Sequence, residues 1–314
     1  ADGKPAVSKQ LFNTKILENL INRVLLEKGN ISKVLYDLIR SGHADTKIID
    51  QFLKAGVDIN FVYNGKGYLH LTASQLTEVG REHQLNYKKE YDIPYVQQYK
   101  IDHDKLVETA LFLVEKGADI NLKNKEGSGF LTSLFGKLPG EQGRYLYLIF
   151  LQNENILKQL SLEDCDVYGR NLLHLLFRGM FDFFYSSSDK PSAKSEFISS
   201  LFSIVRSMKA GQEDMVDKEG NTAGHYLASS ITEEYLKTKD SHGHENRFPA
   251  VAFNLNIKNY YGENPLHMTF SKAGDPFAFY EFALSKFCPV VGWHHVRLLD
   301  LHAKNKQGKS VLDL

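Results

Sequence analysis

The sequence predicts an all-α fold, a solenoid of helix-turn-helix units with short hairpin tips and several insertions. Three observations lead to this prediction. A short polar motif containing a glycine recurs six times along the 314 residues. Apolar residues recur at helical spacing between turns, as with Leu11, Leu20 and Val24 in the segment 8–28. The intervals also contain polar stretches rich in turn-forming residues, which is typical of loops inserted into a repeat.

Each copy of the motif places a glycine five residues before a histidine or its substitute. The copies run over residues 65–70, 127–132, 169–174, 220–225, 262–267 and 308–313. Glycine before a helix start allows a tight hairpin tip to close. The last position is histidine in four copies: His70, His174, His225 and His267. A residue repeated in this way is predicted to be a structural part of each unit and not a catalytic base.

Two linked motifs resemble those of the ankyrin-repeat family. Gly262-Glu-Asn-Pro-Leu-His267 resembles the family's Gly-x-Thr-Pro-Leu-His, and residues 52–60 and 113–121 resemble its Leu-Leu-x-x-Gly-Ala-Asp-Val-Asn. Successive motif glycines lie 42 to 62 residues apart, whereas the family period is about 33 residues, so the repeats are degenerate and carry insertions. The resemblance implies that each histidine bridges backbone groups of adjacent turns and repeats.

Glycine and aspartate in the second motif predict how the helices end. Gly56 and Gly117 stand where a left-handed C-cap is needed, because glycine adopts positive φ without a Cβ penalty. Asp58 and Asp119 follow, and their side chains are expected to bond nearby backbone amides and favour the turn.

The domain organisation predicted is an N-terminal helical cap over 1–40 and an array of about six degenerate repeats over 41–314. The last repeat is truncated at Leu314, which favours a fragment of a larger protein. Insertions are expected at about 75–102, 186–194 and 238–246. The first carries tyrosines four residues apart, interrupted by Pro94. These tyrosines either pack on the solenoid from a helix-turn insertion or form an exposed aromatic binding surface.

Composition excludes several classes of function. Lysine and arginine number 38, as do aspartate and glutamate, so the chain lacks the basic excess typical of nucleic-acid binding. No apolar run is long enough to span a membrane. Cys165 and Cys288 have no paired spacing, which argues against a disulfide framework or a cysteine zinc site and fits a reducing, cytoplasmic compartment.

Catalytic motifs are missing from the sequence. It has no phosphate-binding glycine loop, no nucleophile elbow and no His-Glu-x-x-His. Cys165 lies between two acids, which blunts a thiol, and Cys288 is more typical of an inert buried residue. His242 and His244 with Glu245 make a weak metal motif in a loop. We therefore predict no metal and no cofactor, and we lean away from an enzyme.

The ankyrin resemblance implies a protein-binding scaffold or adaptor whose partner is another protein. Degenerate repeats and an Asn-, Lys- and Tyr-rich composition resemble ankyrin effectors that intracellular bacteria secrete into the host cytosol. One alternative is the targeting module of an enzyme whose catalytic region is missing or unrecognisable; another is a eukaryotic adaptor. The protein-binding residues predicted at the tips are Tyr63, Lys66, Lys125, Glu126, Tyr168, Arg170, Lys218, Tyr260 and Tyr261.

A further hypothesis concerns the asparagine that ends the second motif. Asn121, with Leu113 eight residues before it, resembles the site that the asparaginyl hydroxylase of hypoxia-inducible factor modifies in ankyrin proteins. Asn60 fits less well because Phe52 takes the upstream place. The resemblance implies that this hydroxylase is a modifying partner in a eukaryotic cytosol.

Overall fold

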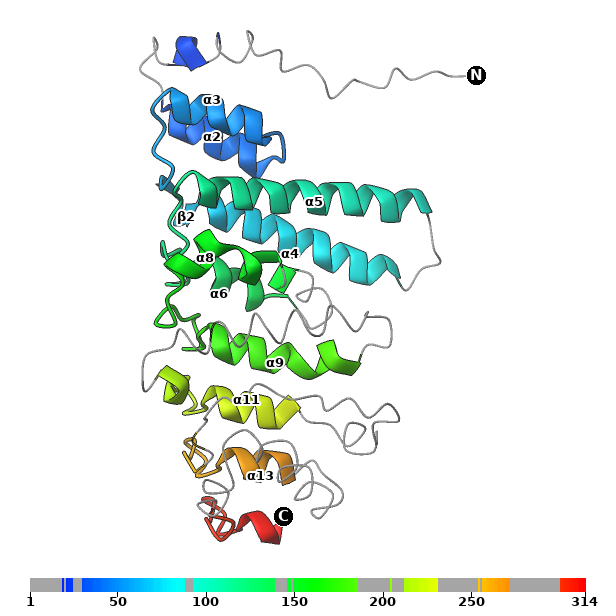
Figure 1. Cartoon of the computed structure of the whole chain (residues 1–314), viewed down its shortest axis with the longest axis vertical. Coiled ribbons are helices and arrows are strands. Elements are labelled where there is room, and N and C mark those ends of the chain that lie inside the picture. The colour runs from blue at the N-terminus through cyan, green and yellow to red at the C-terminus, as the bar shows by residue number, and fades with distance from the viewer. Residues whose placement is uncertain are drawn as a thin grey trace. The chain divides into compact units, whose positions relative to one another are not determined.

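The computed structural model describes residues 19, 21–24, 30–87, 93–138, 146–147, 149–185, 204, 212–230, 254, 256–270 and 300–314. The elements within these ranges are helices, apart from a two-stranded hairpin and isolated β-bridges. The chain divides into two compact units (Figure 1), named here unit 1 (Ala1–Lys125) and unit 2 (Glu126–Leu314).

Unit 1 contains, within its described residues, two helical hairpins joined by a tip. The first hairpin pairs α2 (Ile31–Arg40) with α3 (Thr46–Lys54), and the second pairs α4 (Tyr68–Tyr87) with α5 (Ile93–Glu115). Between them β1 (Val62–Tyr63) and β2 (Lys66–Gly67) form an antiparallel tip, in which Tyr63 pairs with Lys66.

Side chains cap the helix starts of the first hairpin. Asn30 Oδ1 accepts from the amide of Lys33 at 3.0 Å, and Asp45 Oδ1 accepts from the amide of Ile48 at 2.9 Å. Each bond satisfies an amide that an α-helix leaves free at its start. The large side chains that unit 1 buries most completely are Leu35, Ile49, Phe52, Tyr68, Leu76 and Leu113.

At residues 75–102 the described backbone is helical on both sides, as the helix-turn alternative predicted, and it lengthens two helices of the repeat. Of these residues, 75–87 lie in α4 and 93–102 lie in α5, and the two helices are the long arms of one hairpin. Pro94 occupies the first turn of α5, where its missing amide leaves no helical bond unmade. The tyrosine side chains of this segment lie outside the described residues, and so do the predicted insertions at 186–194 and 238–246.

The predicted left-handed caps of unit 1 are confirmed. Gly56 and Gly117 have φ values of +88° and +96°. After each glycine the next amide donates to the carbonyl five residues back, at 3.1 and 2.9 Å, as in a Schellman motif. Asp58 and Asp119 each accept a bond from the amide two residues ahead, at 2.9 and 2.8 Å, as predicted.

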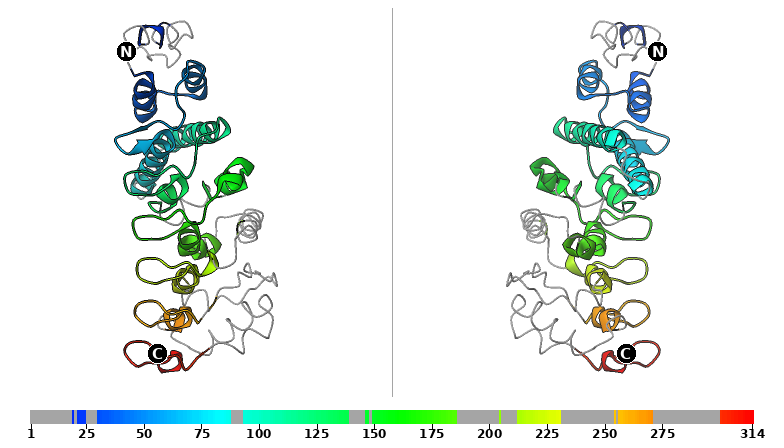
Figure 2. Two further views of the ribbon diagram at one scale, coloured as in Figure 1. Left: turned by 90° about the vertical axis from the view of Figure 1, so that its left-hand side faces the viewer. Right: turned by 90° about the vertical axis from the view of Figure 1, so that its right-hand side faces the viewer.

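Unit 2 repeats a tip followed by a helix. The helices that follow tips are α6 (Phe130–Phe135), α9 (Leu172–Tyr185), α11 (Ala223–Ser230), α13 (Pro265–Phe270) and the 3-10 helix η3 (Val311–Asp313). Between tips lie α8 (Glu154–Gln159) and the 3-10 helix η1 (Gln212–Asp214). Helix α9 packs on α6 and α11, α11 on α13, and α13 on η3. The tips project from the same side of α9, α11, α13 and η3 (Figure 1 and Figure 2).

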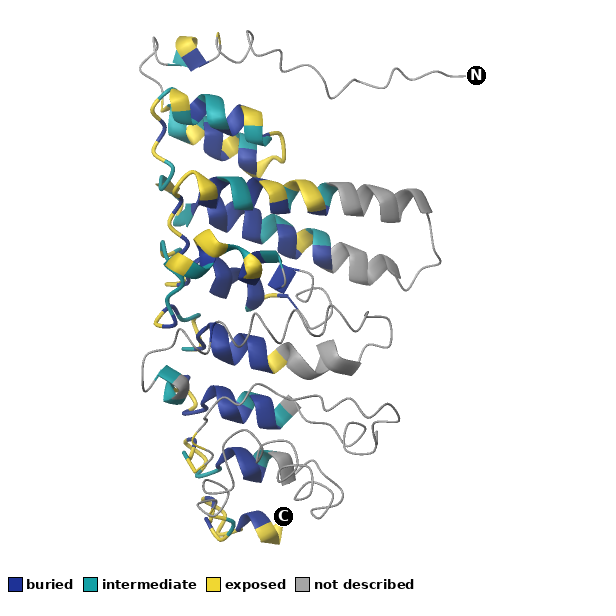
Figure 3. Cartoon of the chain, viewed as in Figure 1, coloured by how far each residue is buried: buried dark blue, intermediate teal, exposed yellow. Residues whose placement is uncertain are grey.

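Apolar side chains hold the stacked helices of unit 2 together. Leu173 and Phe177 on α9 are fully buried, Leu227 on α11 is 3% exposed and Leu266 on α13 is 3% exposed. The first turns of α9, α11 and α13 are accordingly buried (Figure 3). Burying a large apolar side chain contributes about 1.5–3 kcal/mol. Stacking therefore stabilises helices of six to fourteen residues that would be marginal alone.

The predicted fold class, an all-α array of helix-turn-helix units with short tips, is confirmed by these elements. The domain boundaries stay a prediction. Residue 40 is the last residue of α2, inside the hairpin that α2 forms with α3, while the two compact units meet at Lys125 and Glu126.

Candidate functional site

The four tips between α8 and η3 share one backbone design. Their motif glycines Gly169, Gly220, Gly262 and Gly308 have φ values of +76° to +80°. In each tip the residue three before the glycine donates its amide to the carbonyl four residues ahead, at 2.8–2.9 Å, and accepts the glycine amide at 2.9–3.0 Å. The recurring glycine predicted a turn at each tip, and the turn is confirmed. The two backbone hydrogen bonds that close the loop were not predicted.

A side chain at the start of each tip holds the loop closed. One side-chain oxygen of Asp166, Asp217, Asn259 or Asn305 accepts from the amides two and four residues ahead, at 2.8–3.0 Å. The sequence analysis did not single out these residues. Their signal was available, because Asp or Asn precedes each of these glycines by three positions and favours such turns.

Neighbouring tips of unit 2 are linked by single backbone hydrogen bonds. The carbonyls of Tyr168, Glu219 and Tyr261 accept from the amides of Lys218, Tyr260 and Lys306 at 2.9, 2.9 and 3.0 Å. The close approach requires glycine as well as positive φ. At Gly220 a Cβ would lie 2.8–2.9 Å from the ring and amide of Tyr260. The tips therefore form one continuous edge, called here the tip edge.

The predicted role of the motif histidines is confirmed in unit 2. His174 and His225 are at most 1% exposed. Each ring accepts the amide three residues earlier at Nδ1, at 3.2 and 3.0 Å, and reaches the next tip with Nε2, 3.0 Å from the carbonyls of Asn221 and Glu263. Burial lowers the pKa of both histidines, although these carbonyls oppose the shift. Both side chains are therefore neutral structural bridges.

The copies that end in His267 and Thr132 depart from this bridge. His267 also accepts a backbone amide at Nδ1, but among the described residues its buried Nε2 has no hydrogen-bond partner. In unit 1, His70 accepts the amide of Gly67 at 3.2 Å. Thr132 replaces histidine in the motif copy at residues 127–132. Its hydroxyl donates to the buried carboxylate of Asp164 at 2.5 Å. This bond links the repeat of α6 to the next repeat through side chains.

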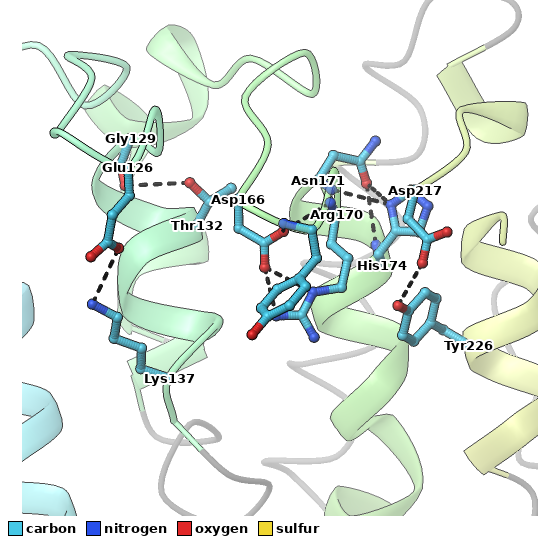
Figure 4. Close-up of polar contacts among 11 residues, drawn as sticks. Glu126, Gly129, Thr132, Lys137, Asp166, Arg170, Asn171, His174, Asp217 and Tyr226 are labelled. Carbon is cyan, nitrogen blue, oxygen red and sulfur yellow. Dashed lines mark hydrogen bonds and ion pairs between the residues drawn. The ribbon is translucent and has the colours of Figure 1, made fainter. Parts of the chain in front are cut away.

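Buried polar side chains bond to one another in the first two of these four tips, which precede α9 and α11 (Figure 4). This row of side chains is called here the polar ladder. Arg170 Nη2 contacts Asp166 Oδ2 at 2.6 Å, and its side chain is 10% exposed. The Tyr226 hydroxyl interacts with Arg170 and donates to Asp217 at 2.8 Å. Asn221 extends the ladder by donating to Asp217 at 3.2 Å.

The ladder favours the ionised form of the Asp217 carboxylate. Burial alone would raise the pKa of Asp217, but bonds from the Tyr226 hydroxyl and from the amides of Asn221 and Glu219 outweigh burial and lower it. The pKa of Tyr226 is raised by burial and by its bond to Asp217. These groups are saturated with internal partners, so we assign them to the scaffold of the tips.

Six of the predicted binding residues are exposed. Tyr168, Tyr260 and Tyr261 are 61%, 61% and 58% exposed on the tip edge of unit 2. Lys218 on the second tip is also exposed. Lys125 is exposed in unit 1, where its amide donates to Gly65, and Glu126 begins unit 2 with an ion pair to Lys137 at 3.6 Å.

The other three predicted binding residues are less available. Arg170 is 8% exposed and engaged with Asp166. Tyr63 packs edge-on against Tyr36, with ring centroids 5.3 Å apart, and Lys66 donates to Ser74 at 3.2 Å. The sequence predicted that Tyr63 and Arg170 are exposed because both lie in turns. Their actual exposure depends on Tyr36 and Tyr226, which are far away in the chain.

The two candidate hydroxylation asparagines have different surroundings in unit 1. Asn60 Oδ1 accepts from the amide of Asp119 at 2.9 Å, which ties the two second-motif turns together. Asn121 donates its own amide to Asp119 at 2.8 Å and is half-buried. Hydroxylation of either residue stays a prediction.

Possible metal ligands, membrane-spanning helices and cysteines can be located for the described residues. These residues hold no group of three His, Cys, Asp or Glu side chains placed to bind a metal ion. In the same part of the chain no helix is long and apolar enough to cross a membrane. Cys165 is half-buried and forms no disulfide, while Cys288 and residues 242–245 lie outside the described ranges.

Stacked helices, backbone-linked tips and histidine bridges define a repeat array of the ankyrin type. Two solved structures are similar to the chain at low sequence identity. The ankyrin repeat domain of Bcl-3, a unique member of the IkappaB protein family, is 15% identical with a TM-score of 0.47, over 88% of this chain and 91% of that one. The ankyrin repeat protein EF0377 is 14% identical with a TM-score of 0.37, over 89% and 88%. No family model matches the sequence, and no curated protein matches it either.

Proposed function

We propose that this chain is a protein-interaction module that binds its partner through the tip edge of unit 2. The observation that carries the proposal is the exposure of Tyr168, Tyr260 and Tyr261 on a backbone that internal bonds hold in place. Tyrosine combines a large apolar ring with a polar end and is enriched at the energetic centres of protein interfaces.

The polar side chains behind the edge support the proposal. Asp166, Arg170, Asp217 and Tyr226 bond to one another and to the tip backbone, so they lower the mobility of the tips without using the exposed face. A rigid edge loses little conformational entropy on binding, which favours affinity. The exposed rings therefore meet a partner from a preorganised backbone.

We further propose that the protein bound by the module is a host protein and that the chain acts as an effector inside a host cell. It is supported by the degenerate, widely spaced repeats and by the Asn-, Lys- and Tyr-rich composition. The proposed location is the cytoplasm, which for a bacterial effector is that of the host. The alternative is a targeting module for an enzyme, and detection of catalytic motifs in a longer gene product would favour it.

The test compares capture by the chain with capture by a triple variant, Tyr168→Ser, Tyr260→Ser and Tyr261→Ser. Leu312→Ser is the control, because Leu312 is 56% exposed but lies on η3 and not on a tip. Proteins captured from a host-cell lysate should be lost with the triple variant and retained with the control. Equal capture by all three forms would overturn the assignment of the tip edge.

A further inference from the structure

We propose that the last two tips, residues 258–262 and 304–309, bind an acidic segment of a partner protein, one that presents several Asp or Glu carboxylates. The inference rests on the proposed function and adds the chemistry of the partner. It comes from a difference in charge between the first two and the last two tips of unit 2, which otherwise share the same backbone.

The difference begins at the residue that closes each tip. Asp166 and Asp217 close the first two tips with a carboxylate, whereas Asn259 and Asn305 close the last two with an amide oxygen. The bonds to the backbone amides have the same pattern and lengths of 2.8–3.0 Å in all four tips. Asparagine therefore preserves the loop and removes one negative charge from each of the last two tips.

The last two tips have fewer carboxylates at the closing position, and they also carry more exposed cations than the first two. In the first tip Arg170 is buried and neutralised by Asp166, and in the second tip the exposed Lys218 is followed by the exposed Glu219. The last two tips carry Lys258, Lys304, Lys306 and Lys309, and all four side chains are exposed. Within the described residues none of these lysines forms an ion pair.

Geometry brings these lysines together. Lys258 Nζ donates to the carbonyl of Lys304 at 3.0 Å, which places an ammonium from one tip on the backbone of the next. The amide of Lys306 is bonded to Tyr261 of the preceding tip at 3.0 Å. Lys309 follows directly after the glycine of the last tip. Four positive charges thus lie on two tips that are joined by hydrogen bonds.

Among the described residues, three acidic side chains lie in or beside these tips, fewer than the four lysines, and Lys304 and Lys309 attract one of them, Asp313. Asp313 accepts from the Ser310 hydroxyl and amide, both at 2.7 Å, and so is used as a helix cap. Glu263 follows the glycine of the third tip and is half-buried, and Asp300 is exposed on the segment before the last tip. Glu263 holds in the third tip the position that Lys309 holds in the fourth, so the two tips together carry four lysines and one glutamate, and the excess of positive charge lies on the fourth tip.

The basic surface is short, which favours an acidic protein segment over a nucleic acid. The tip next to it carries exposed Glu219, whose carbonyl bonds directly to the amide of Tyr260. A nucleic acid has a continuous row of phosphates and needs a basic stripe of matching length. A short run of carboxylates fits two tips and ends before Glu219.

Exposed tyrosines complete the surface. Tyr260 and Tyr261 lie on the third tip between the lysines and Glu219. Such rings supply apolar contact area beside the charges, which lysine ion pairs alone do not provide because exposed pairs are weak and screened by salt. We expect the acidic segment to contain an apolar residue as well.

The test is fluorescence anisotropy with a short labelled peptide in which glutamate alternates with serine and one tryptophan is included. A peptide with glutamine in place of every glutamate is the matched probe. The full chain should bind the glutamate peptide at least about tenfold more tightly, and raising NaCl from about 0.05 M to about 0.5 M should weaken that binding strongly.

Two variants locate the surface. Lys306→Glu with Lys309→Glu should weaken binding at least about tenfold, whereas Lys218→Glu, at the position in the second tip that Lys306 has in the fourth, should change it less than about threefold. Asn305→Asp restores a carboxylate that can accept the same two amides. It should weaken binding several-fold while leaving the unfolding midpoint unchanged.

Equal binding of the two peptides, or an equal effect of the Lys218 and Lys306 changes, would overturn the inference. Tighter binding of duplex DNA or of phosphatidylserine vesicles than of the glutamate peptide would also overturn it. If the lysine variants bind normally while the tyrosine triple variant still loses its captured proteins, the acidic partner is excluded and the proposed function stands. If the lysine variants keep peptide binding and the tyrosine triple variant keeps protein capture, both the acidic partner and the proposed function are rejected.

Discussion

Replacing His225 by alanine tests how far the stack depends on its histidine bridges. The ring is fully buried, accepts the amide of Thr222 at 3.0 Å and reaches the carbonyl of Glu263 in the next tip at 3.0 Å. The structure supplies a matched control in His267, which is equally buried and keeps the local bond to an amide at 3.2 Å. Among the described residues, His267 Nε2 makes no bond.

The expected magnitudes follow from this difference. Both alanine variants lose a buried ring and a local hydrogen bond, which costs about 2–3 kcal/mol. His225→Ala also loses the bond to the next tip and leaves a buried carbonyl unpaired, which adds about 1–2 kcal/mol. We therefore expect the free energy of unfolding to fall by about 3–5 kcal/mol for His225→Ala and by about 2–3 kcal/mol for His267→Ala.

The assay is urea unfolding followed by far-ultraviolet circular dichroism, with hydrogen exchange of the amides around Glu263 as a local readout. Exchange there should accelerate more in His225→Ala than in His267→Ala. Because repeat arrays can unfold in parts, the local readout decides between a lost bridge and a general loss of stability. Losses that agree within about 0.5 kcal/mol, with equal exchange, would refute the reasoning.

Three further predictions concern pH, a tip glycine and the hydroxylation site. Burial lowers the pKa of the bridging histidines His174 and His225 below the ordinary value of 6.5. Their contribution to stability is complete above pH 6.5 and is lost as pH falls through the folded-state pKa values, because the unfolded chain then binds more protons. The urea midpoint should drop between about pH 7.5 and 5, and a His174→Gln, His225→Gln chain with an equally steep drop would contradict this. Gly220→Ala should destabilise the chain by about 1–2 kcal/mol more than Gly127→Ala, measured by thermal unfolding. Both have positive φ, but only at Gly220 does the tip of the next repeat lie in the way; equal losses would argue against the backbone-linked edge. Co-expression with the asparaginyl hydroxylase should add one oxygen to the peptide that contains Asn121, and a mass spectrum without that addition would reject the hydroxylation hypothesis.

Much of the backbone design was predictable from local chemistry. Glycine at fixed offsets predicted the turns, since a positive φ is strained for other residues. Repetition of histidine predicted a structural role, and burial with a bond to the next tip confirms it for His174 and His225. The asparagine and aspartate that close the tips were equally visible in the sequence and were overlooked, because attention to helical periodicity passes over loop positions.

Side-chain exposure was less predictable. Arg170 and Tyr168 are two residues apart in the same tip, yet one is 8% and the other 61% exposed. The difference arises because Asp166 binds the guanidinium and the Tyr226 hydroxyl, from the following repeat, forms a hydrogen bond with it. A sequence pattern within one repeat contains no information about that neighbour. The helix-turn alternative for residues 75–102 predicted helical arms, but the sequence did not show that they continue the helices of the repeat, since polar residues fit a helix arm as well as a loop.

By itself the sequence determined the class of fold and the places where the chain turns, because those depend on the local conformational preferences of glycine, aspartate and asparagine. Only the tertiary structure decided which tip residues face solvent and which stabilise the edge from behind. It also joined the lysines of the last two tips into one basic surface. The physical reason is that exposure and net local charge depend on contacts between repeats, and residues far apart in the chain make those contacts.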